Sequence, residues 1–333
     1  MNRKSLYGLN EIWLRLLSGN SATIWIATIS LFLVSPLIAP GSLSSSSTLS
    51  MLPFASVLAI VAAGQTLVVQ QRGLDLSVPG MIALAAVLCT SLTQNYNWPT
   101  WLAVLAGIAG PGIIGLLNGI FVSIFRVVPI VITLGMNSVL IGLVFFISKG
   151  TPSGATNNLN QFALDKHFGI PNTVLVALVA LAIAGFVTQR TIIGRRLTAI
   201  GVSVRAASAL GQRVTLYQIL TYGFAAVCYG AGGVLLAGYI KTPQLFLGDS
   251  YLLPSVAAVV LGGTALTGGV ASIVSSGVAA LFLTQLGQLL RSLGWPDSSQ
   301  YIAQSAALVL VVVLRELVYR YSARNKPKKS VSA

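Results

Sequence analysis

The sequence predicts an all-α polytopic membrane protein with about ten transmembrane helices. Only 8% of its 333 residues are charged and 55% are hydrophobic, whereas a soluble globular protein carries about 25% charged residues. Its long apolar runs lack the alternation of a membrane β-strand, and backbone groups in lipid must pair inside a helix or a closed barrel. These observations favour one helical transmembrane domain covering residues 1–333.

The N-terminal region begins with charged residues and continues into an apolar stretch. Residues 1–20 include Arg3, Lys4, Glu11 and Arg15, and residues 21–39 are uncharged. This arrangement resembles a signal peptide, but the apolar stretch is long enough to span a bilayer and further apolar runs follow it. We therefore expect a retained signal anchor.

The charge-free stretches divide into spans by length, because a helix needs about 20 residues to cross the hydrocarbon. A Ser-rich linker at Gly41–Ser47 separates the first two spans, and Tyr96, Trp98 and Trp101 suit an interfacial aromatic belt between the third and fourth. The predicted positions are two spans in Leu16–Gln71, two in Leu76–Phe125, one each in Val127–Ser148, Pro171–Gln189 and Val214–Ile240, two in Ser250–Leu290 and one in Ser298–Leu314.

Two spans carry small residues at every fourth position, which lets a neighbouring helix approach closely. In the fourth span these are Ala103, Gly107, Pro111, Gly115 and Gly119, and in the ninth they are Gly268, Ser272, Ser276 and Ala280. The eighth span is different, because Tyr251 and Gly262 bound a short apolar run of about ten residues. A short, Gly-interrupted segment is typical of a broken helix at a transport site, and a tilted helix is the alternative.

Ten crossings place both termini on the same side of the membrane, and the basic residues indicate which side it is. Sixteen of the 20 basic residues fall on the terminal side, which leaves Lys149, Lys166, Lys241 and Arg291 on the other. Basic residues concentrate on the cytoplasmic side, so we expect residues 1–20, 190–213 and 316–333 to be cytoplasmic. The net charge of +14 follows from this rule and does not predict nucleic-acid binding, because the basic residues border apolar runs.

Groups that could support catalysis or ATP binding are missing from the sequence. No two carboxylates fall in one neighbourhood, the single histidine is His167 in a polar stretch, and no lysine follows a glycine as in a phosphate-binding loop. Cys89 and Cys228 lie in predicted spans as small packing residues, without metal-ligand spacing. We therefore expect no enzyme activity, metal or cofactor in this chain.

The predicted spans contain neutral polar residues but no ionisable ones. Such residues suit the passage of an uncharged, hydroxyl-rich solute, and interhelical hydrogen bonds worth about 0.6 kcal/mol each are the alternative. The candidates for the translocation pathway are Gln65, Thr66, Asn118, Thr133, Asn137 and Tyr222. A proton- or sodium-coupled carrier needs a group that changes charge within the pathway, and the predicted spans offer none.

A transporter with neither a phosphate-binding loop nor an ion-coupling residue must take its energy from another chain. That chain would dock on a cytoplasmic loop, and residues 190–213 form the longest one. Within it, Val204–Leu210 can form two helical turns ended by Gly211. We expect these turns to face the partner.

Five motifs lie in order between about Leu58 and Arg315. They are GLDLSV at Gly73–Val78, NG at Asn118–Gly119, PxxxTLG at Pro129–Gly135, GRRxxAIG at Gly194–Gly201 followed by AA at Ala206–Ala207 and by Gly211, and AAVVLGGTxLxGG at Ala257–Gly269. In these motifs the chain resembles the permease subunits of bacterial ABC importers for ribose, arabinose, galactosides and related solutes, including quorum signals. Three positions depart from the family pattern: Arg72 replaces the first glycine of GG, Pro79 replaces a small residue, and Ser203 replaces an expected asparagine.

The resemblance implies a type II ABC importer bundle in the bacterial inner membrane, with one short Gly-interrupted helix. It implies a coupling helix that sits in a cleft of a separate ATPase subunit, which binds ATP and magnesium. It also implies a second permease, either another copy or a paralogue, and a periplasmic solute-binding protein. The residues implied in ATPase coupling are Gly194, Arg195, Arg196, Gly201, Arg205, Ala206, Ala207 and Gly211.

The expected function is import of a small sugar or sugar-like solute, of the ribose or autoinducer-2 type, by alternating access. A branched-chain amino acid permease shares the general pattern, but its zwitterionic solute needs a firmer anion-binding helix start than the sequence offers. A stand-alone secondary carrier, and a membrane scaffold or polytopic enzyme subunit, are further alternatives. Transport by the purified chain without ATP or a partner would distinguish the carrier from the importer subunit.

Overall fold

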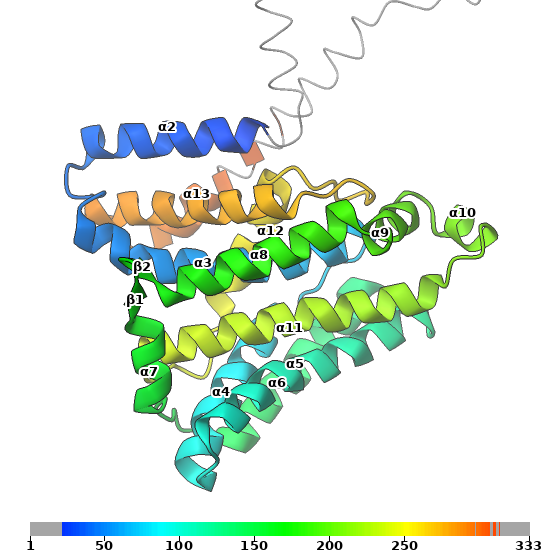
Figure 1. The fold of residues 1–333 in the computed structure, drawn as a ribbon, viewed down its shortest axis with the longest axis horizontal. Helices are drawn as coiled ribbons and strands as arrows, with labels where there is room; N and C mark the ends of the chain where they lie inside the picture. The colour runs from blue at the N-terminus through cyan, green and yellow to red at the C-terminus, as the bar shows by residue number, and fades with distance from the viewer. Residues whose placement is uncertain (1–21, 297, 307–308, 311–312, 314–333) are drawn as a thin grey trace, which may run out of the picture.

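The computed structural model describes residues 22–296, 298–306, 309–310 and 313. Its long helices lie side by side in one bundle (Figure 1). Within the described ranges the regular structure is helical apart from a two-residue pairing, in which β1 (Lys166–His167) runs antiparallel to β2 (Ile170–Pro171). His167 lies in this small hairpin, where its Nδ1 is 2.6 Å from Oδ1 of Asn172.

Nine described helices coincide in order with the first nine predicted spans. Seven are long and apolar enough to cross a membrane, while α2 and α12 are shorter. The bounds are α2 (Ala22–Ile38), α3 (Ser45–Gln70), α4 (Val78–Tyr96), α5 (Thr100–Ser123), α6 (Pro129–Ser148), α8 (Asn172–Arg190), α11 (Val214–Ile240), α12 (Leu252–Leu261) after the 3-10 turn η1 (Asp249–Tyr251), and α13 (Ile273–Ser292). The tenth span, Ser298–Leu314, lies partly outside the described residues and stays a prediction.

Three shorter helices connect the spans among the described residues, and two of them lie in the expected cytoplasmic loop, residues 190–213. The segment after α8 forms α9 (Ile192–Val202) and α10 (Val204–Ala209), so only its second half behaves as predicted. At the other end of the bundle, α7 (Asn157–Leu164) precedes the β-hairpin.

Helix α3 forms the centre of the bundle, and α6 lies at its surface. Nearly all residues of α3 from Ala55 onward are buried, whereas α6 buries only Thr133, Leu140, Val144 and Ser148. Because α6 is apolar along its whole length, most of its side chains face outward into an environment that must itself be apolar. This arrangement is that of a chain whose solvent is the lipid bilayer.

The small-residue face predicted for the fourth span is confirmed. Ala103, Gly107, Pro111, Gly115 and Gly119 of α5 are all buried. A Cβ atom at Gly115 would lie 2.4 Å from Cβ of Ala226, and one at Gly119 would lie 2.6 Å from Cα of Ile219. Glycine at these positions therefore brings the backbones of α5 and α11 into direct contact.

Replacing Gly115 by leucine is expected to separate α5 from α11. Its side chain would meet Ala226 and the carbonyl oxygen of Tyr222, and overpacking of this kind costs about 1–3 kcal/mol. Thermal unfolding of the detergent-solubilised protein measures the loss. The matched control is Gly142→Leu on α6, where nothing lies within 4 Å of the added Cβ; equal losses for the two variants would contradict this packing.

The corresponding prediction for the ninth span is only partly right. Ser276 and Ala280 are buried in α13, but Gly268 lies in the preceding turn with φ +83° and the side chain of Ser272 caps the first turn of the helix. The chain leaves the helical conformation because Gly263, Gly268 and Gly269 all take positive φ values. The short eighth span is confirmed, since α12 ends at Leu261.

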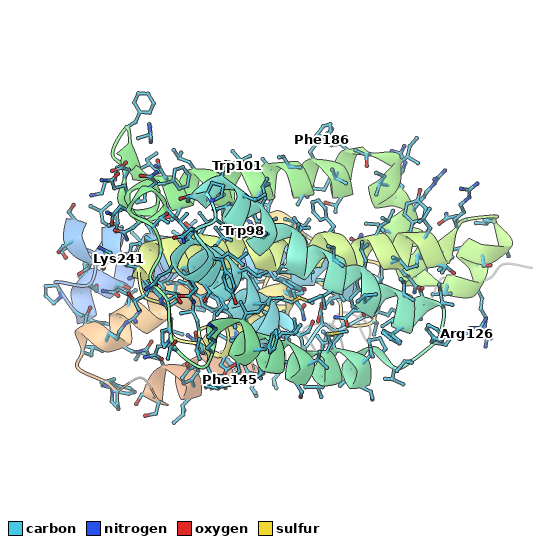
Figure 2. All side chains as sticks on the ribbon, turned by 90° about the horizontal axis from the view of Figure 1, so that it is seen from below. Trp98, Trp101, Arg126, Phe145, Phe186 and Lys241 are labelled. Atoms are coloured by element: carbon cyan, nitrogen blue, oxygen red, sulfur yellow. The ribbon has the colours of Figure 1, made fainter. Side chains whose placement is uncertain are left out.

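The two ends of the bundle carry different basic residues. Because α3, α5 and α8 end where α4, α6 and α11 begin, Arg72, Arg126, Arg190 and Arg213 share one end, called here the arginine-rich end. Figure 2 shows Arg126 far from Lys241, which lies at the opposite end. This separation is the one predicted by charge counting, and the assignment of the arginine-rich end to the cytoplasm stays a prediction.

Candidate functional site

The arginine-rich end carries a helix pair, α9 and α10, of which α10 lies farthest from the centre of the bundle (Figure 1). Helix α9 buries Gly194, Leu197, Ile200 and Gly201. These residues recur at helical spacing and therefore form one face. The other face is exposed, which leaves one side of α9 packed on the bundle and the other free for a partner.

Helix α10 is a separate two-turn element, as predicted. The Ser203 hydroxyl accepts a hydrogen bond from the Ala206 backbone N–H at 3.2 Å, so this serine serves as the N-cap, a task that asparagine would perform equally well. Gly211 ends the element with φ +75°, and the Gln212 N–H donates to the Ala207 carbonyl oxygen at 3.1 Å. The departure at Ser203 thus leaves the start of α10 intact.

The predicted coupling residues fall into two groups. Gly194, Gly201 and Ala207 are buried, and Arg195, Arg196, Arg205, Ala206 and Gly211 are exposed. The buried glycines permit close backbone approach: a Cβ atom at Gly194 would lie 1.8 Å from the Thr188 carbonyl oxygen. The Arg196 guanidinium donates to the Tyr217 hydroxyl. Only the exposed group can contact a partner, while the buried group fixes the pair on the bundle.

Three chain segments meet where α9 ends, at a site called here the junction (Gln70–Arg72, Thr198–Val202 and Gly268–Gly269). The Gln70 carbonyl oxygen accepts from the Gly269 N–H at 2.9 Å, and Gln70 Nε2 donates to Thr198 Oγ1 at 3.0 Å. A Cβ atom at Gly201 would lie 2.0 Å from that Gln70 carbonyl oxygen. The junction therefore joins α9 to the central helix α3 and to the turn before α13.

Arg72 completes the junction. Its Nε donates to the Gly201 carbonyl oxygen at 2.6 Å, and Nη2 donates to the Val202 carbonyl oxygen. The sequence marked Arg72 only as a departure from the family pattern. Its task was not predictable because both partners are backbone oxygens more than a hundred residues away.

A carboxyl group lies inside the bundle, which corrects the expectation of an interior without ionisable residues. Asp75 belongs to the link between α3 and α4, yet its side chain is 0% exposed. Its Oδ1 accepts from the Ser77 N–H at 2.9 Å and from the Ser77 hydroxyl at 2.5 Å. Burial raises the pKa of Asp75, and the two hydrogen bonds from Ser77 partly oppose that rise.

Four predicted pathway candidates hold this link in place. Gln65 Nε2 donates to the Asp75 carbonyl oxygen at 3.2 Å, Asn118 Nδ2 donates to the Ser77 hydroxyl at 3.1 Å, Thr133 Oγ1 accepts from the Leu76 N–H at 3.0 Å, and Asn137 Oδ1 accepts from the Gly80 N–H at 2.8 Å. We call these four residues with Asp75 and Ser77 the Asp75 cluster. It draws on α3, α5 and α6 to fix the start of α4.

The two remaining candidates lie beside this cluster. Thr66 Oγ1 donates to Ser276 Oγ at 2.8 Å and so joins α3 to α13. The Tyr222 hydroxyl presses against Gly73, where a Cβ atom would lie 2.6 Å away. Neither that hydroxyl nor Asp75 Oδ2 has a hydrogen-bond partner among the described residues. A role of the six candidates in solute passage stays a prediction.

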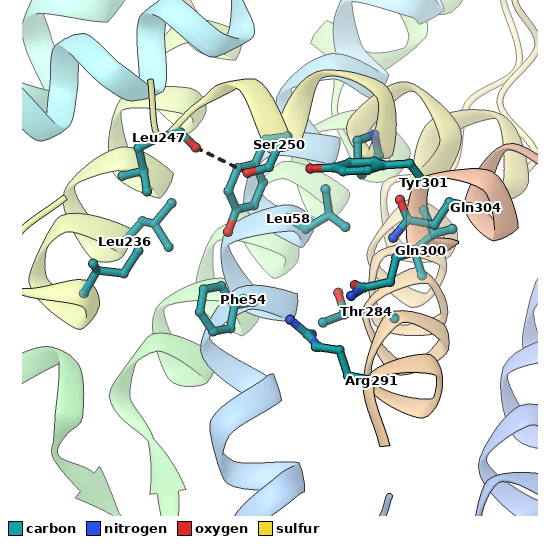
Figure 3. Close-up of a pocket in the computed structure, with 15 residues that line it drawn as sticks. Phe54, Leu58, Leu236, Leu247, Ser250, Thr284, Arg291, Gln300, Tyr301 and Gln304 are labelled. Atoms are coloured by element: carbon teal, nitrogen blue, oxygen red, sulfur yellow. Dashed lines mark hydrogen bonds between the residues drawn. The ribbon is translucent and has the colours of Figure 1, made fainter. Parts of the chain in front are cut away.

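A cavity of about 340 Å³ opens elsewhere, toward the end opposite the arginine-rich end (Figure 3). It lies between α3, α11, α12, α13 and residues 300–304, and none of the six candidates lines it. Its volume is that of a small-molecule site. Its polar and aromatic lining residues are Phe54, Ser250, Tyr251, Thr284, Arg291, Gln300, Tyr301 and Gln304. Sequence reasoning missed them because they come from four separate segments, which no single motif contains.

Comparison with known proteins gives relatives along nearly the whole chain. The ribose import permease protein RbsC of Bacillus subtilis (strain 168) is 28% identical over 85% of this chain and 89% of its own length. RbsC of Escherichia coli (strain K12) is 29% identical over 87% and 91%, and the galactose/methyl galactoside import permease MglC of the same strain is 29% identical over 84% and 89%.

The comparison with solved structures gives no match. The family model described as "Branched-chain amino acid transport system / permease component" matches residues 47–314. That range runs from the start of α3 through the junction, the Asp75 cluster and the cavity. This chain therefore belongs to the family of branched-chain amino acid transport system permease components.

Proposed function

We propose that this chain is the membrane permease subunit of an ATP-driven importer for a small sugar or sugar-like solute, of the ribose or autoinducer-2 type. The observation that carries the proposal is the helix pair α9–α10, which is packed on the bundle through one face and leaves Arg195, Arg205 and Ala206 exposed. A subunit that is moved by another chain needs such a surface. The relatives named as ribose and galactoside import permeases support the solute class.

The proposal assigns ATP and magnesium to a separate ATPase subunit docked on α10. The arginine-rich end is then cytoplasmic, as are both termini, and the membrane is the bacterial inner membrane. A periplasmic solute-binding protein docks at the opposite end. A second copy of this chain or a paralogous permease packs alongside, and the apolar outward face of α6 is available for it.

The cavity suits the first contact with such a solute. Phe54 and Tyr301 provide flat apolar surfaces, while Thr284 and Gln304 provide groups that donate and accept hydrogen bonds. Arg291 adds a fork of N–H donors at the same site. These are the groups that recognise a neutral solute with many hydroxyl groups. We place solute reception here, at the periplasmic end, before alternating access carries the solute inward.

The deciding experiment is ATP hydrolysis by the reconstituted complex in liposomes. The chain is combined with the ATPase subunit and with a solute-binding protein loaded with ribose, galactose, autoinducer-2 or leucine. We expect a sugar-like ligand to stimulate hydrolysis and to be taken up. Stimulation by leucine alone would show an amino acid permease instead, and uptake by the chain without ATP would show a secondary carrier.

Removing one hydroxyl from the cavity is expected to weaken solute uptake without affecting the fold. In Thr284→Val the side chain keeps its shape and loses an oxygen whose only hydrogen bond to a described residue is to Ala280 of the same helix, at 2.8 Å. Loss of one hydrogen bond to the solute raises the KM for uptake about 2- to 10-fold. Thr93→Val is the matched control, since its hydroxyl also bonds its own helix but does not line the cavity. An unchanged KM in Thr284→Val would exclude this residue from solute contact.

A further inference from the structure

Arg72 occupies a backbone conformation that favours glycine. Its φ is +66°, in the left-handed region, which glycine adopts freely and in which a Cβ atom is disfavoured. Glycine stands at this position in the family pattern, so this chain places an arginine where a less strained residue would fit. The arginine side chain makes contacts there that glycine could not make.

Those contacts are the last carbonyl groups of α9. Helix C-termini leave up to four carbonyl oxygens without partners inside the helix, and a positive charge is favourable there. The Arg72 guanidinium donates to the carbonyl oxygens of Gly201 and Val202 through two different nitrogens. The fork therefore fixes both the position and the orientation of the end of α9, which a single donor could not do.

The helix that precedes Arg72, α3, leads directly to the interior of the bundle. Arg72 follows α3, and α3 also carries Gln65, which holds the Asp75 link, and Thr66, which holds α13. Beside the guanidinium, a Cβ atom at Gly268 would lie 2.5 Å from Arg72 Cγ, so the turn before α13 packs directly against the Arg72 side chain. The end of α9 therefore contacts both the end of α3 and the turn before α13.

We propose that Arg72 is a positioning residue for energy coupling: it clamps the end of α9 onto α3, so that movement of α9–α10 by the ATPase subunit reaches the Asp75 cluster. This inference rests on the proposed function, because it requires an ATPase partner. Without the clamp, α9 keeps its buried face and the Gln70–Thr198 hydrogen bond. It still binds the ATPase, but it moves α3 less. ATP is then hydrolysed with little solute transport.

The test is Arg72→Gly, which separates coupling from stability. Glycine removes the whole arginine side chain but also relieves the positive φ, so the melting temperature should change little. The solute carried per ATP hydrolysed, measured in liposomes with the ATPase and binding proteins, should fall about tenfold or more, since even one of the two lost charge-assisted hydrogen bonds corresponds to about a tenfold change in an equilibrium constant. Arg72→Lys keeps the charge but loses the fork, and an intermediate ratio is expected.

The matched control is Arg126→Gly. Arg126 also has a positive φ, +56°, and is exposed at the same end of the bundle, but its side chain donates no hydrogen bond to a described residue. Its transport ratio should be unchanged. An unchanged ratio in Arg72→Gly, or an equal fall in both variants, would overturn the proposal, as would loss of the ATPase subunit from the Arg72→Gly complex. If Ala206→Glu keeps full uptake, the proposed function fails independently of Arg72.

Discussion

Replacing Ala206 by glutamate is expected to abolish uptake while the chain remains folded and inserted in the membrane. Ala206 is exposed on α10, three residues after the N-cap Ser203. Glutamate at this position completes a capping box with the serine, so the substitution favours α10 locally. It places a bulky negative charge on the surface proposed to meet the ATPase subunit, where an unpaired buried charge would cost roughly 2–5 kcal/mol.

The measurements are solute uptake and co-purification of the ATPase subunit. Both should be lost in Ala206→Glu, while the melting temperature of the isolated permease stays the same. Ala206→Ser is the conservative control and should retain both. Ala207→Glu is expected to act on the fold instead. Ala207 is 1% exposed, and a buried carboxylate there should lower the melting temperature of the isolated permease. Normal uptake with bound ATPase in Ala206→Glu would remove α10 from the coupling interface.

The long helices were predictable because lipid permits few alternatives. An uncharged apolar run of sufficient length has to be a helix, and nine described helices follow the predicted order. The small-residue spacing of α5 was informative for the same reason, since a repeat of four residues forms one face only if the segment is helical. The repeat from Gly268 to Ala280 predicted a continuous small-residue face, but its first members precede α13. In that turn, glycines with positive φ end the helical conformation.

Helix α9 was missed because its charges exclude it from lipid but do not decide its conformation. Its buried residues Gly194, Leu197, Ile200 and Gly201 have helical spacing, yet two of the four are glycines, which give little hydrophobic signal. Their importance comes from close contacts with Thr188 and Gln70. Such contacts exist only once the bundle has formed, and no local pattern in the sequence encodes them.

The burial of Asp75 was also not predictable from the local sequence. Hydropathy correctly places it between two spans, and the natural conclusion is that it faces water. The link is instead drawn into the bundle by Asn118 on α5 and by Thr133 and Asn137 on α6. The GLDLSV motif was the only signal available, because an aspartate in an otherwise apolar motif is costly unless its oxygens are hydrogen-bonded.

The Asp75 carboxyl is expected to act through its shape and hydrogen bonds and not through its charge. Asp75→Asn should therefore retain uptake and lose less stability than a variant without both oxygens. The asparagine Oδ1 can accept both hydrogen bonds from Ser77, while Nδ2 takes the place of Oδ2, which has no partner among the described residues, and brings N–H groups that need an acceptor there. Burial raises the pKa of Asp75, which means that this environment accommodates a neutral group better than an ionised one.

Asp75→Ala should behave differently, because it leaves the Ser77 N–H and hydroxyl without their acceptor at the start of α4, where Ser77 itself provides no side-chain cap. Buried groups left unpaired cost about 1–3 kcal/mol each, so a lower melting temperature and reduced uptake are expected. Comparing the two variants also distinguishes ATP-driven transport from ion-coupled transport. If Asp75→Asn folded normally but transported nothing, transport would need the charge of the buried carboxyl. That result would favour ion coupling, in addition to the ATPase or in place of it.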